Sequence, residues 1–421
     1  MDPVEARAAS RESLIEEIVG GTRRFHQLPA ELSAEEKASI RREALQRLKG
    51  IDLGDVGHFS VDAEVASTRH CENFVGVAQI PLGVTGPLKI RGRYVRPDEE
   101  VFVPLATTEG ALLASINRGC RAISVVGGAE VWVEDVGMTR APAFRTSGAE
   151  QTAEFLGWLR DNEETIRQLA ESTSRYLKLL DIRAQAVGTS VYVRFRFASG
   201  DAMGMNMATI ACDRVVRDLI EPTTGVTCVA LSGNYCVDKK PSAVNFLEGR
   251  GKRVHAEVVL DESVLKKVLK TDARSLVDVQ YRKNLLGSIA AGALGYNAHF
   301  ANVIAAFFAA CGQDLAQVVE AAMGITCIEP RGPEGVYMSV NMPDVPLGAV
   351  GGGTALGTQR EALDLMGIAV DDAEPGAAAM RLAEILAATV LAGELSLMAA
   401  FTSRDLARAH EELGRGKLHD G

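Results

Sequence analysis

The sequence predicts an α/β (α+β) protein with a short N-terminal helical region, a large domain around a long buried helix, and a smaller inserted domain. Between residues 140 and 231 the apolar patterns follow the order β-α-β-β-α-β, the split βαβ plan of a ferredoxin-like domain. Residues 302–322 are apolar nearly all round, which is typical of a central, buried helix. A length of 421 residues is enough for two or three domains with ample core.

Composition excludes several classes of protein. Hydrophobic residues make up 47% and charged residues 24% of the chain, as in ordinary soluble globular proteins. A net charge of −10 argues against general nucleic-acid binding, because phosphates attract basic surfaces. The seven cysteines form no C-x-x-C pair, and H-E-x-x-H is absent, so we expect reduced thiols and no metal site.

Neither a secretory signal nor a membrane span is expected. The first residues are charged and lack an apolar h-region. The most apolar long window, residues 385–400, contains Glu394 and is better explained as a buried helix.

The N-terminal 50 residues are charged and favour helix. Ser33 and Glu36 form a plausible capping box for a helix that extends through Leu48. A solvated, partly disordered arm is the alternative. Residues 71–88 follow, and their recurring Gly and Pro within an apolar segment predict extended chain with tight bends.

A helix is predicted to begin near Glu109, with Thr107 or Thr108 as its cap. A lone Glu at this position is explained most simply as an acid that interacts with the helix dipole. The apolar face of the helix consists of Leu112, Leu113, Ile116 and Cys120.

The segment from 140 to 231 contains the predicted small domain. Its elements are a strand near Ala143, a helix over 149–172, strands over 176–186 and 191–197, a helix that Pro222 stops near Ile220, and a strand over 226–231. Residues 201–206, D-A-M-G-M-N, lie on a strand-to-helix turn, where free backbone N–H groups and the helix dipole suit phosphates. The pattern is not G-x-G-x-x-G, which excludes a Rossmann site, and a plain turn is the alternative.

An acid and two lysines, Asp238, Lys239 and Lys240, stand directly before Pro241. Two neighbouring ammonium groups repel, so a fold that fixes both suggests an anionic ligand or a developing oxyanion. A solvated turn is about as plausible from these residues alone.

The C-terminal half contains the strongest single-residue indication of chemistry. Asp314 falls in the middle of the predicted buried helix over 302–322, where a carboxylate must be paired or protonated. The glycine run within 348–359 permits close backbone approach to a ligand, or forms a flexible loop. A final helix over about 376–413 carries His410.

Eight segments, taken together and in this order, resemble the hydroxymethylglutaryl-CoA (HMG-CoA) reductases over residues 55–413. They are E-N-F-V-G-V-A-Q-I-P-L-G-V-T-G-P-L, T-T-E-G, D-A-M-G-M-N, G-N-Y-C-V-D-K-K-P, N-A-H-F-A-N, C-G-Q-D, G-G-G-T and G-E-L-S-L-M-A-A. The D-K-K form is more similar to the biosynthetic, NADPH-using class, and the sequence looks like a soluble prokaryotic-type form without a membrane anchor.

The resemblance implies roles for individual residues. The catalytic set it implies is Glu109, Lys239, Asp314 and His410. The HMG group would be held by Arg140, Ser232, Asp238, Lys240, Lys283 and Asn302. The helix that meets CoA carries Asn117, Arg118 and Arg121. Contacts to the nicotinamide cofactor are implied for Ser174, Arg175, Asp201, Met203, Gly204, Met205, Asn206, Gly351, Gly352, Gly353 and Thr354.

The resemblance also implies an organisation and an activity. The expected parts are an N-terminal helical region (1–60), a large HMG-CoA-binding catalytic domain (61–141 and 242–421), a small ferredoxin-like NADP-binding domain (142–231) and a catalytic lysine loop (232–241). The activity is the two-step reduction of (S)-3-hydroxy-3-methylglutaryl-CoA to (R)-mevalonate and CoA, through mevaldyl-CoA and mevaldehyde, with NADPH (NADP) and no metal.

The expected protein is a cytoplasmic homodimer or homotetramer that binds HMG-CoA and CoA and neither nucleic acid nor membrane. The alternatives are NAD-dependent oxidation of mevalonate and a catalytically silent CoA-ester binding protein. In the leading interpretation Lys239 stabilises oxyanions. Glu109 gives a proton to the aldehyde oxygen, and His410 protonates the departing CoA thiolate.

The sequence departs from the family pattern in three places. T-S-R-D-L stands over 402–406, where family members usually have A-A-G-x-L, which bears on how the C-terminal segment closes. Gly416 occupies the position of a phosphorylatable Ser in eukaryotic members, so that switch should be missing. Val237 replaces a more usual Thr.

Overall fold

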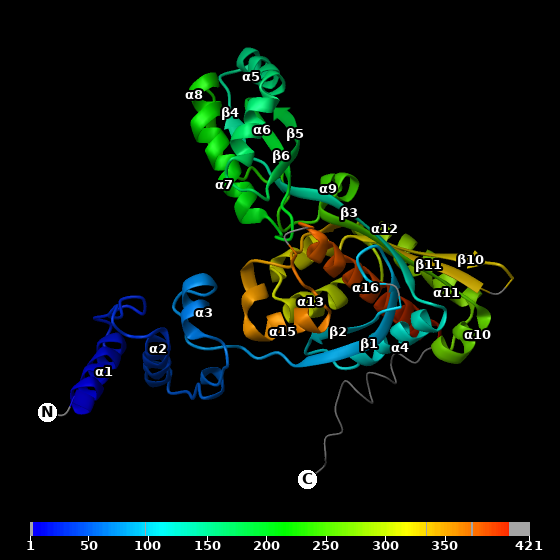
Figure 1. Ribbon diagram of the computed structural model, residues 1–421, viewed down its shortest axis with the longest axis horizontal. Helices are drawn as coiled ribbons and strands as arrows, with labels where there is room; N and C mark the ends of the chain where they lie inside the picture. The colour runs from blue at the N-terminus through cyan, green and yellow to red at the C-terminus, as the bar shows by residue number, and fades with distance from the viewer. Residues whose placement is uncertain (1–2, 97, 334, 372–373, 404–421) are drawn as a thin grey trace, which may run out of the picture.

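The computed structural model describes residues 3–96, 98–333, 335–371 and 374–403. Three parts are visible in Figure 1: N-terminal helices, a large body around helix α16, and a smaller α/β unit above it. The N-terminal elements are α1 (Pro3–Val19), α2 (Ala34–Lys49), η1 (Asp55–Gly57) and α3 (Ala63–Arg69).

The large body contains the remaining elements outside residues 143–230. Its strands are β1 (Leu82–Arg91), β2 (Glu100–Ala106), β3 (Ala129–Arg140), β8 (Arg250–Leu260), β9 (Gly295–Tyr296), β10 (Gly324–Arg331) and β11 (Gly335–Val345). Its helical segments are α4 (Leu112–Val125), α9 (Ala243–Glu248), α10 (Glu262–Val264), η3 (Leu265–Leu269), α11 (Ala273–Val279), η4 (Gln280–Gly287), α12 (Ser288–Ala291), α13 (Phe300–Cys311), η5 (Leu315–Gln317), α14 (Val318–Ala321), η6 (Gly352–Ala355), α15 (Gly357–Leu365) and α16 (Ala377–Ser403).

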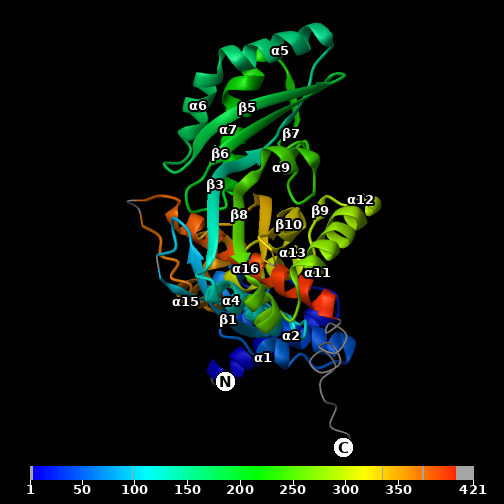
Figure 2. The same cartoon turned by 90° about the vertical axis from the view of Figure 1, so that its right-hand side faces the viewer.

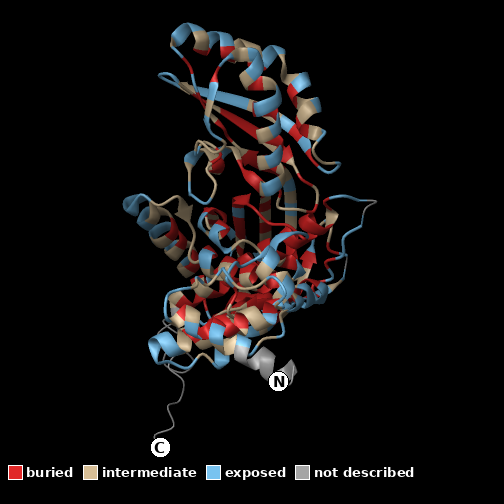
Figure 3. Ribbon diagram, turned by 90° about the vertical axis from the view of Figure 1, so that its left-hand side faces the viewer, coloured by how far each residue is buried: buried red, intermediate tan, exposed pale blue. Residues whose placement is uncertain are grey.

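Helix α16 is the centre of the main hydrophobic core. It packs against α4, α13, β3 and β8, and its side chains from Ala378 to Leu395 are buried. Figure 3 shows this buried interior running through the lower part of the molecule. By composition α16 is long and apolar enough to cross a membrane, but 83% of its most apolar stretch is buried inside the protein. The prediction of a buried helix over 385–400 is therefore confirmed.

The predicted long helix over 302–322 is wrong. Helix α13 ends at Cys311 because Gly312 adopts φ 68°, and η5 and α14 follow as separate short turns. A Cβ at Gly312 would lie 2.4 Å from the Gly353 carbonyl, so only glycine permits this approach. Apolar periodicity alone missed the break, and the long central helix is α16.

The smaller unit has the expected element order. It consists of β4 (Ala143–Arg145), α5 (Ala149–Asp161), α6 (Glu163–Glu171), β5 (Lys178–Val187), β6 (Ser190–Ala198), α7 (Met205–Val215), η2 (Val216–Ile220), α8 (Glu221–Thr224) and β7 (Thr227–Ala230). Its strands lie in the order β7-β4-β6-β5, with every neighbouring pair antiparallel. A second hydrophobic cluster, which includes Phe144, Phe155, Phe195 and Phe197, fills this unit.

Two local predictions in this unit were wrong. The helix over 149–172 is divided at Asn162 into α5 and α6. Pro222 does not stop the second helix, because it stands in the first turn of α8, where its missing N–H is not needed. Gly225, with φ 67°, ends α8 instead.

Strand β3 joins the two parts. Its first residues pair with β8 in the body, and Met138–Arg140 pair with β6 of the smaller unit. Figure 2 shows β3 and β8 running side by side up to the junction. Side chains at the ends of these strands therefore lie where body and smaller unit meet.

The N-terminal region is helical, as predicted. Ser33 and Glu36 form the capping box at the start of α2, with both reciprocal hydrogen bonds present. Helices α1 and α2 share a small apolar cluster that includes Ile15 and Ile40. Residues 72–81 then form an extended link to β1, which agrees with the bends expected for 71–88.

The close packing of α4 on α16 makes a testable prediction. A Cβ at Gly119 would lie 1.9 Å from the Ala392 carbonyl oxygen, and a backbone atom cannot move aside as a side chain can. Gly119→Ala should therefore lower the free energy of unfolding by roughly 1–3 kcal/mol, despite the better helix propensity of Ala. The measurement is the urea midpoint and the thermal midpoint of each purified variant.

Gly157→Ala in α5 is the matched control, because the added Cβ would have only the distal Arg160 Nη2 within reach, at 3.9 Å. This substitution should be neutral or stabilise by up to about 1 kcal/mol. Equal effects of the two substitutions would contradict the packing argument.

Candidate active site

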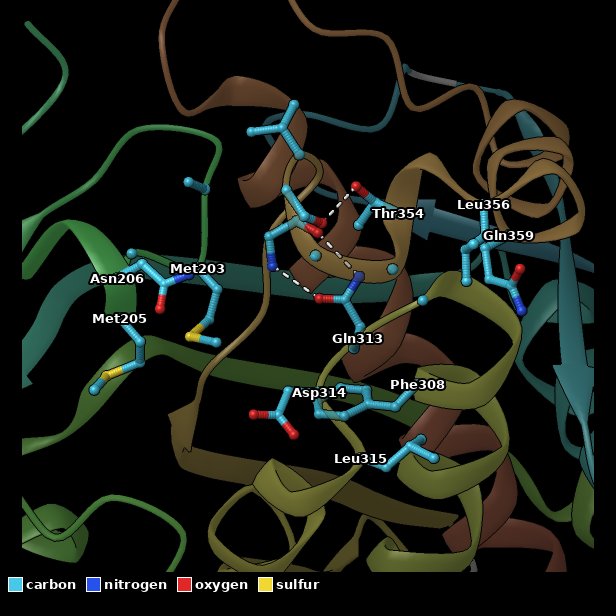
Figure 4. Close-up of a pocket in the computed structure, with 18 of the residues that line it drawn as sticks. Met203, Met205, Asn206, Phe308, Gln313, Asp314, Leu315, Thr354, Leu356 and Gln359 are labelled. Carbon is cyan, nitrogen blue, oxygen red and sulfur yellow. Dashed lines mark hydrogen bonds between the residues drawn. The ribbon is translucent and has the colours of Figure 1, made fainter. Parts of the chain in front are cut away.

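A cavity of about 870 Å³ lies at the junction of the smaller unit and the body. Four segments line it: the turn before α7, the lysine loop over 232–241, the end of α13, and the glycine-rich turn over 348–354. Figure 4 shows Met203, Asn206, Gln313, Asp314 and Thr354 around this space. The predicted site residues that line it are Arg140, Asp238, Lys239, Asp314, Met203, Gly204, Met205, Asn206, Gly351, Gly352, Gly353 and Thr354.

Lys239 and Asp314 form an ion pair in this cavity. Lys239 Nζ lies 2.8 Å from Asp314 Oδ2. Asp314 also accepts a hydrogen bond from the Ala316 N–H at 3.1 Å, as the N-cap of η5. The carboxylate is paired, as expected, although it follows α13 and is not in the middle of a helix. Because both side chains are about 40% exposed (43% and 34%), the pair contributes little to stability, and its value lies in its position.

The lysine loop has an unusual backbone. Asn234, Val237 and Lys239 all have φ between 52° and 62°, a region that non-glycine residues rarely adopt. Residues held there persist only when the surrounding structure fixes them, and they cluster at functional sites. The loop therefore depends on contacts from the body beneath it.

Asp238 is fixed by two donors from that body. Its Oδ1 accepts hydrogen bonds from Arg250 Nη2 and from Gln317 Nε2, each at 2.9 Å. Burial alone would raise the pKa of Asp238. The charge of Arg250 and the hydrogen bond from Gln317, with a contribution from Lys239, hold that pKa below its ordinary value. Asp238 is therefore ionised in the folded protein, and its negative charge helps to hold the loop on Arg250.

The turn before α7 and the glycine-rich turn both need small residues. Gly204, with φ 96°, is the N-cap of α7, and a Cβ there would lie 2.4 Å from Ser199 Oγ. Gly348 exchanges two hydrogen bonds of 2.9 Å with the Gln313 amide (Figure 4). Thr354 Oγ1 donates to the Gly351 carbonyl at 2.7 Å. These bonds hold a concave backbone surface beside the Lys239–Asp314 pair.

Some residues predicted to contact the cofactor do not line the cavity. Asp201 is buried, and its carboxylate accepts N–H bonds from Gly376 (2.9 Å) and Ala379 (3.0 Å), so it caps α16. Ser174 accepts the Tyr176 N–H, and the exposed Arg175 stacks over the Tyr176 ring, 4.4 Å from its centroid.

Ser232 and Lys240 belong to the lysine loop without lining the cavity. Ser232 Oγ lies 3.4 Å from Cys236 Sγ. Lys240 is exposed, and its Nζ lies 3.3 Å from the Asp238 carbonyl oxygen.

Glu109, Lys283 and Asn302, here called the distal group, lie elsewhere in the fold. Glu109 is exposed, and Lys283 lies 5.2 Å from the ring centroid of Phe401 in α16. Burial lowers the pKa of Lys283, and the charge of Glu394 opposes this shift. Asn302 is in the first turn of α13, whose opposite end reaches the cavity.

Helix α4 does not begin at Glu109, contrary to prediction. It begins at Leu112 after Ala111 with φ 70°, and the Thr107 hydroxyl accepts the Glu109 N–H at 3.0 Å. Glu109 therefore lies outside helix α4, three residues before Leu112, so an interaction with the helix dipole does not explain its position. The predicted apolar face is correct for Leu112, Ile116 and Cys120, which are buried.

The predicted CoA-binding residues are on α4. Asn117 Oδ1 accepts the Gly86 N–H at 2.8 Å, and Arg118 bonds the Ser396 hydroxyl and carbonyl in α16, at 3.0 and 2.7 Å. Arg121 is exposed. His410 lies outside the described residues.

Sequence reasoning missed the charged residues beneath the lysine loop. Arg250 and Glu320 are fully buried and joined at 2.8 Å, and neither was singled out. A signal was present: Glu320 interrupts an apolar run, V-V-E-A-A-M, where a charge must find a partner. In the part of the chain that the structure describes, no group of three or more His, Cys, Asp or Glu side chains is placed to hold a metal ion.

Comparison with known sequences decides the family. The profile described as hydroxymethylglutaryl-coenzyme A reductase matches residues 37–415. A 3-hydroxy-3-methylglutaryl-coenzyme A reductase of Pyrococcus abyssi is 47% identical over 408 residues, which cover 96% of this chain and 99% of that protein.

The chain belongs to the hydroxymethylglutaryl-coenzyme A reductase family. The reductase of Methanothermobacter thermautotrophicus is also 47% identical, over 96% of this chain and all of that protein. The 3-hydroxy-3-methylglutaryl-coenzyme A reductase 1 of Hevea brasiliensis is 42% identical over 98% of this chain and 72% of that protein.

Solved structures share the fold. The 3-hydroxy-3-methylglutaryl-coenzyme A reductase of Streptococcus pneumoniae aligns with a TM-score of 0.65 and 18% identity, over 94% of this chain and 96% of that chain. A structure of the class II enzyme from the same organism, bound to NADPH in open conformations, aligns with a TM-score of 0.63 over 79% of this chain and 78% of that chain. At this identity the likeness shows a shared mixed α/β fold.

The lowered pKa of Asp238 predicts a pH-dependent contribution to stability. Because its folded-state pKa lies below the unfolded value of about 3.9, the contribution is present above that pH and is lost as pH falls through the folded-state pKa. Asp238→Asn should cost roughly 1–3 kcal/mol near pH 7, since Arg250 loses a charged partner. The measurement is the difference in thermal midpoint from wild type, which should shrink towards pH 3.

Asp278→Asn is the control, because Asp278 is exposed and its carboxylate pairs with Arg282, four residues further along the chain, at 2.8 Å. It should change the midpoint little at either pH. A pH-independent loss for Asp238→Asn would mean that the charge of its carboxylate is not what holds the loop.

Proposed function

We propose that this chain is a biosynthetic HMG-CoA reductase that converts (S)-3-hydroxy-3-methylglutaryl-CoA to (R)-mevalonate and CoA with two molecules of NADPH. The observation that carries the proposal is the Lys239–Asp314 pair in a large cavity beside two glycine-containing turns, in a chain of this family. Each reduction adds a hydride to a carbonyl carbon and leaves negative charge on its oxygen. Lys239 Nζ is the donor placed to stabilise that charge.

Other residues of the chain handle substrate and protons. Asp238 and Arg140 line the cavity beside Lys239. We assign Arg140 to the carboxylate of the HMG group and Asp238 to its hydroxyl, from which an ionised carboxylate can accept a hydrogen bond. Asp314 orients the Lys239 ammonium through their ion pair. Glu109 is assigned the proton for the aldehyde oxygen, and His410 the proton that converts the departing thiolate of CoA to a thiol.

We propose that NADPH binds at the two turns that line the cavity. An added Cβ at Gly204, Gly348 or Gly353 would lie within 2.8 Å of other protein atoms. Only glycine therefore allows the two turns to pack this closely against their neighbours. The residues proposed to hold the cofactor are Met203, Gly204, Met205, Asn206, Gly351, Gly352, Gly353 and Thr354. Bound NADPH would supply the hydride in each step. Arg175, exposed and stacked on Tyr176, is our candidate for the 2′-phosphate, because guanidinium pairs well with phosphate.

Residues 142–231 are proposed as an inserted ferredoxin-like cofactor domain, with 61–141 and 242–421 as the catalytic domain and 1–60 as the N-terminal helical region. The separate apolar cluster and the strand order β7-β4-β6-β5 support this division. We further propose a cytoplasmic enzyme without nucleic-acid, membrane or metal partners. A net charge of −10 and the burial of α16 support the first two points.

We infer that the active site is completed by a second copy of the chain, in a homodimer or homotetramer. The cavity lies at the start of α16, where Asp201 caps the helix and Ala202 lines the cavity wall. The first turns of α4 contact Ser396 in α16. Ser396 lies about 20 residues, or roughly 30 Å, from the start of α16 at Ala377. Glu109, just before α4, is therefore distant from Lys239 of its own chain and is exposed to a neighbour.

The assay that tests the function uses purified protein, HMG-CoA and either NADPH or NADH, followed at about 340 nm, where reduced nicotinamide absorbs. We expect turnover with HMG-CoA and a higher kcat/KM with NADPH. Equal or better turnover with NADH would support mevalonate oxidation as the physiological reaction. Binding of HMG-CoA without turnover would support the silent CoA-ester binding protein.

Lys239 and His410 should separate the two half-reactions. Lys239→Ala should lower kcat by on the order of 10²–10³ with both HMG-CoA and free mevaldehyde, because an oxyanion develops in each step. His410→Gln should cripple HMG-CoA reduction and leave mevaldehyde reduction largely intact, because no CoA departs in that step. Near-normal mevaldehyde reduction by Lys239→Ala would contradict the oxyanion role, and equal losses for His410→Gln would assign that residue to folding or general binding.

Mixing two inactive variants should restore activity if the site is shared between copies. In a dimer that contains one Glu109→Gln chain and one Lys239→Ala chain, one of the two sites has both original residues. In a random 1:1 assembly, half of the dimers are mixed and each mixed dimer has one active site of two. The mixture should therefore recover about a quarter of wild-type activity. Co-expression with different affinity tags allows the mixed dimer to be isolated and assayed. No recovery, or a fully active monomer in light scattering, would contradict the shared site.

A further inference from the structure

A cluster of buried charged and polar side chains lies directly beneath the lysine loop. Its members, here called the buried charge cluster, are Asn245 in α9, Arg250 in β8, Glu320 in α14 and Asp344 in β11, each with 0% exposure. The consecutive elements α9 and β8 thus meet α14 and β11, which come later in the sequence, at one point. With two acids and one guanidinium, the cluster carries a net charge of −1 unless one of the acids holds a proton.

The cluster holds the backbone of the loop through Glu320 and Asn245. Glu320 Oε1 accepts the Lys239 N–H and Arg250 Nη1, each at 2.8 Å. Asn245 Nδ2 lies 3.3 Å from the Val237 carbonyl oxygen and from Glu320 Oε2. Val237 and Lys239 are two of the residues with positive φ, so the cluster bonds the strained positions of the loop.

Arg250 connects the loop to the turn proposed to hold the cofactor. Its Nη2 donates to Asp238 Oδ1 at 2.9 Å and lies 2.8 Å from Met205 Sδ. Its Nε donates to Thr139 Oγ1 at 3.0 Å. A displacement of the Arg250 guanidinium would therefore disturb both Asp238 in the lysine loop and Met205 at the start of α7, on two sides of the cavity.

Asp344 has the surroundings of an acid that keeps its proton. Its Oδ2 accepts Asn245 Nδ2 at 2.8 Å, whereas the buried Oδ1 has no partner while both acids are ionised. Burial, and then the charge of Glu320, raise the pKa of Asp344 well above its ordinary range, while Arg250 opposes the shift. A protonated Asp344 can donate to Glu320, and that bond raises its pKa further.

We propose that Glu320 and Asp344 are positioning residues that share one proton and so hold Arg250 and the Lys239 backbone in place for the reaction. With its proton, Asp344 neutralises the excess negative charge and leaves Glu320 free to accept from Arg250 and Lys239. The ammonium of Lys239 is thereby kept on Asp314 in the cavity. This role rests on the proposed function, because it concerns the geometry of its oxyanion donor.

The charged groups around Asp344 come from each element packed on it. Glu320 faces it from α14, Arg250 from β8, and Asp238 from the lysine loop through Arg250. Lys252, which pairs with Val345 in the β8–β11 ladder, is engaged by Asp135 at 2.7 Å.

The proton makes a prediction that needs no substrate. Because the folded-state pKa of Asp344 is raised, its contribution to stability is fully present below the unfolded value of about 3.9 and is lost as pH rises towards the folded-state pKa. Asp344→Asn keeps a donor for Glu320 and cannot ionise. The thermal midpoint of the wild type should therefore fall relative to Asp344→Asn as pH rises from about 5 to 8. Parallel pH profiles of the two midpoints would overturn the shared proton.

Kinetics test the positioning role. Glu320→Ala should lower kcat with both HMG-CoA and mevaldehyde by on the order of 10²-fold, with KM for HMG-CoA roughly unchanged, because a small misplacement of Lys239 affects the transition state more than binding. Glu320→Gln, whose amide oxygen can still accept from Lys239 and Arg250, should recover most of the loss. A kcat for Glu320→Ala within about twofold of wild type, or equal losses for Ala and Gln, would overturn the role.

Glu384→Ala is the matched control. Glu384 is also a fully buried carboxylate that accepts backbone N–H bonds, from Arg93, Tyr94 and Val95 at 2.7–3.0 Å, but it does not line the cavity. It should lower the thermal midpoint without changing kcat per folded molecule, and an equal fall in kcat would overturn a specific effect of Glu320. A wild-type protein that fails to reduce HMG-CoA would instead contradict the proposed function, and the pH dependence of the midpoints would still decide the shared proton.

Discussion

The fold depends on the burial of helix α16, and that burial requires the carboxylates on or near the helix to find partners. Unpaired charges in an apolar interior are too costly to persist. Glu384 meets this requirement by accepting three backbone N–H groups of residues 93–95, and Glu394 by accepting those of Ala298 and His299. Asp201 caps the first turn of the helix from the smaller unit. Each carboxylate thus ties a distant segment of chain to the same helix.

This arrangement explains why the cavity lies where it does. The residue that caps α16 is followed at once by the turn that lines the cavity, so burying the helix also places Met203, Gly204 and Met205. Strand β3 enters the junction from the body, and Arg140 at its end lines the same space. The glycine-rich turn can approach α13 only because Gly312 and Gly353 have no side chains. Structure and site are thus products of the same packing constraints.

The charges beneath the lysine loop are arranged for geometry more than for stability. A buried ion pair such as Arg250–Glu320 gains little net free energy, since removing both charges from water offsets most of their attraction, but losing one partner is strongly destabilising. Such a network favours one arrangement of the loop over its alternatives. That is useful where three residues adopt positive φ and one of them carries the ammonium group needed in the cavity. The position of the partly exposed Lys239–Asp314 pair then depends on the buried charges beneath the loop, and not on the ion pair alone.

Local patterns and motifs in a fixed order were enough to predict the class of fold, the β-α-β-β-α-β order of the smaller unit, the capping box of α2 and the family. The sequence also singled out Lys239 and Asp314, which form an ion pair in the cavity. It did not determine which helix is central, because α13 and α16 are both apolar and only the close approach at Gly312 shows that α13 must end. Only the tertiary structure placed Glu109 and Lys283 away from the cavity and assembled Arg250, Glu320 and Asp344 beneath the loop. Those residues are up to 94 positions apart (250 to 344), and no periodicity in a single sequence records which buried charges will meet.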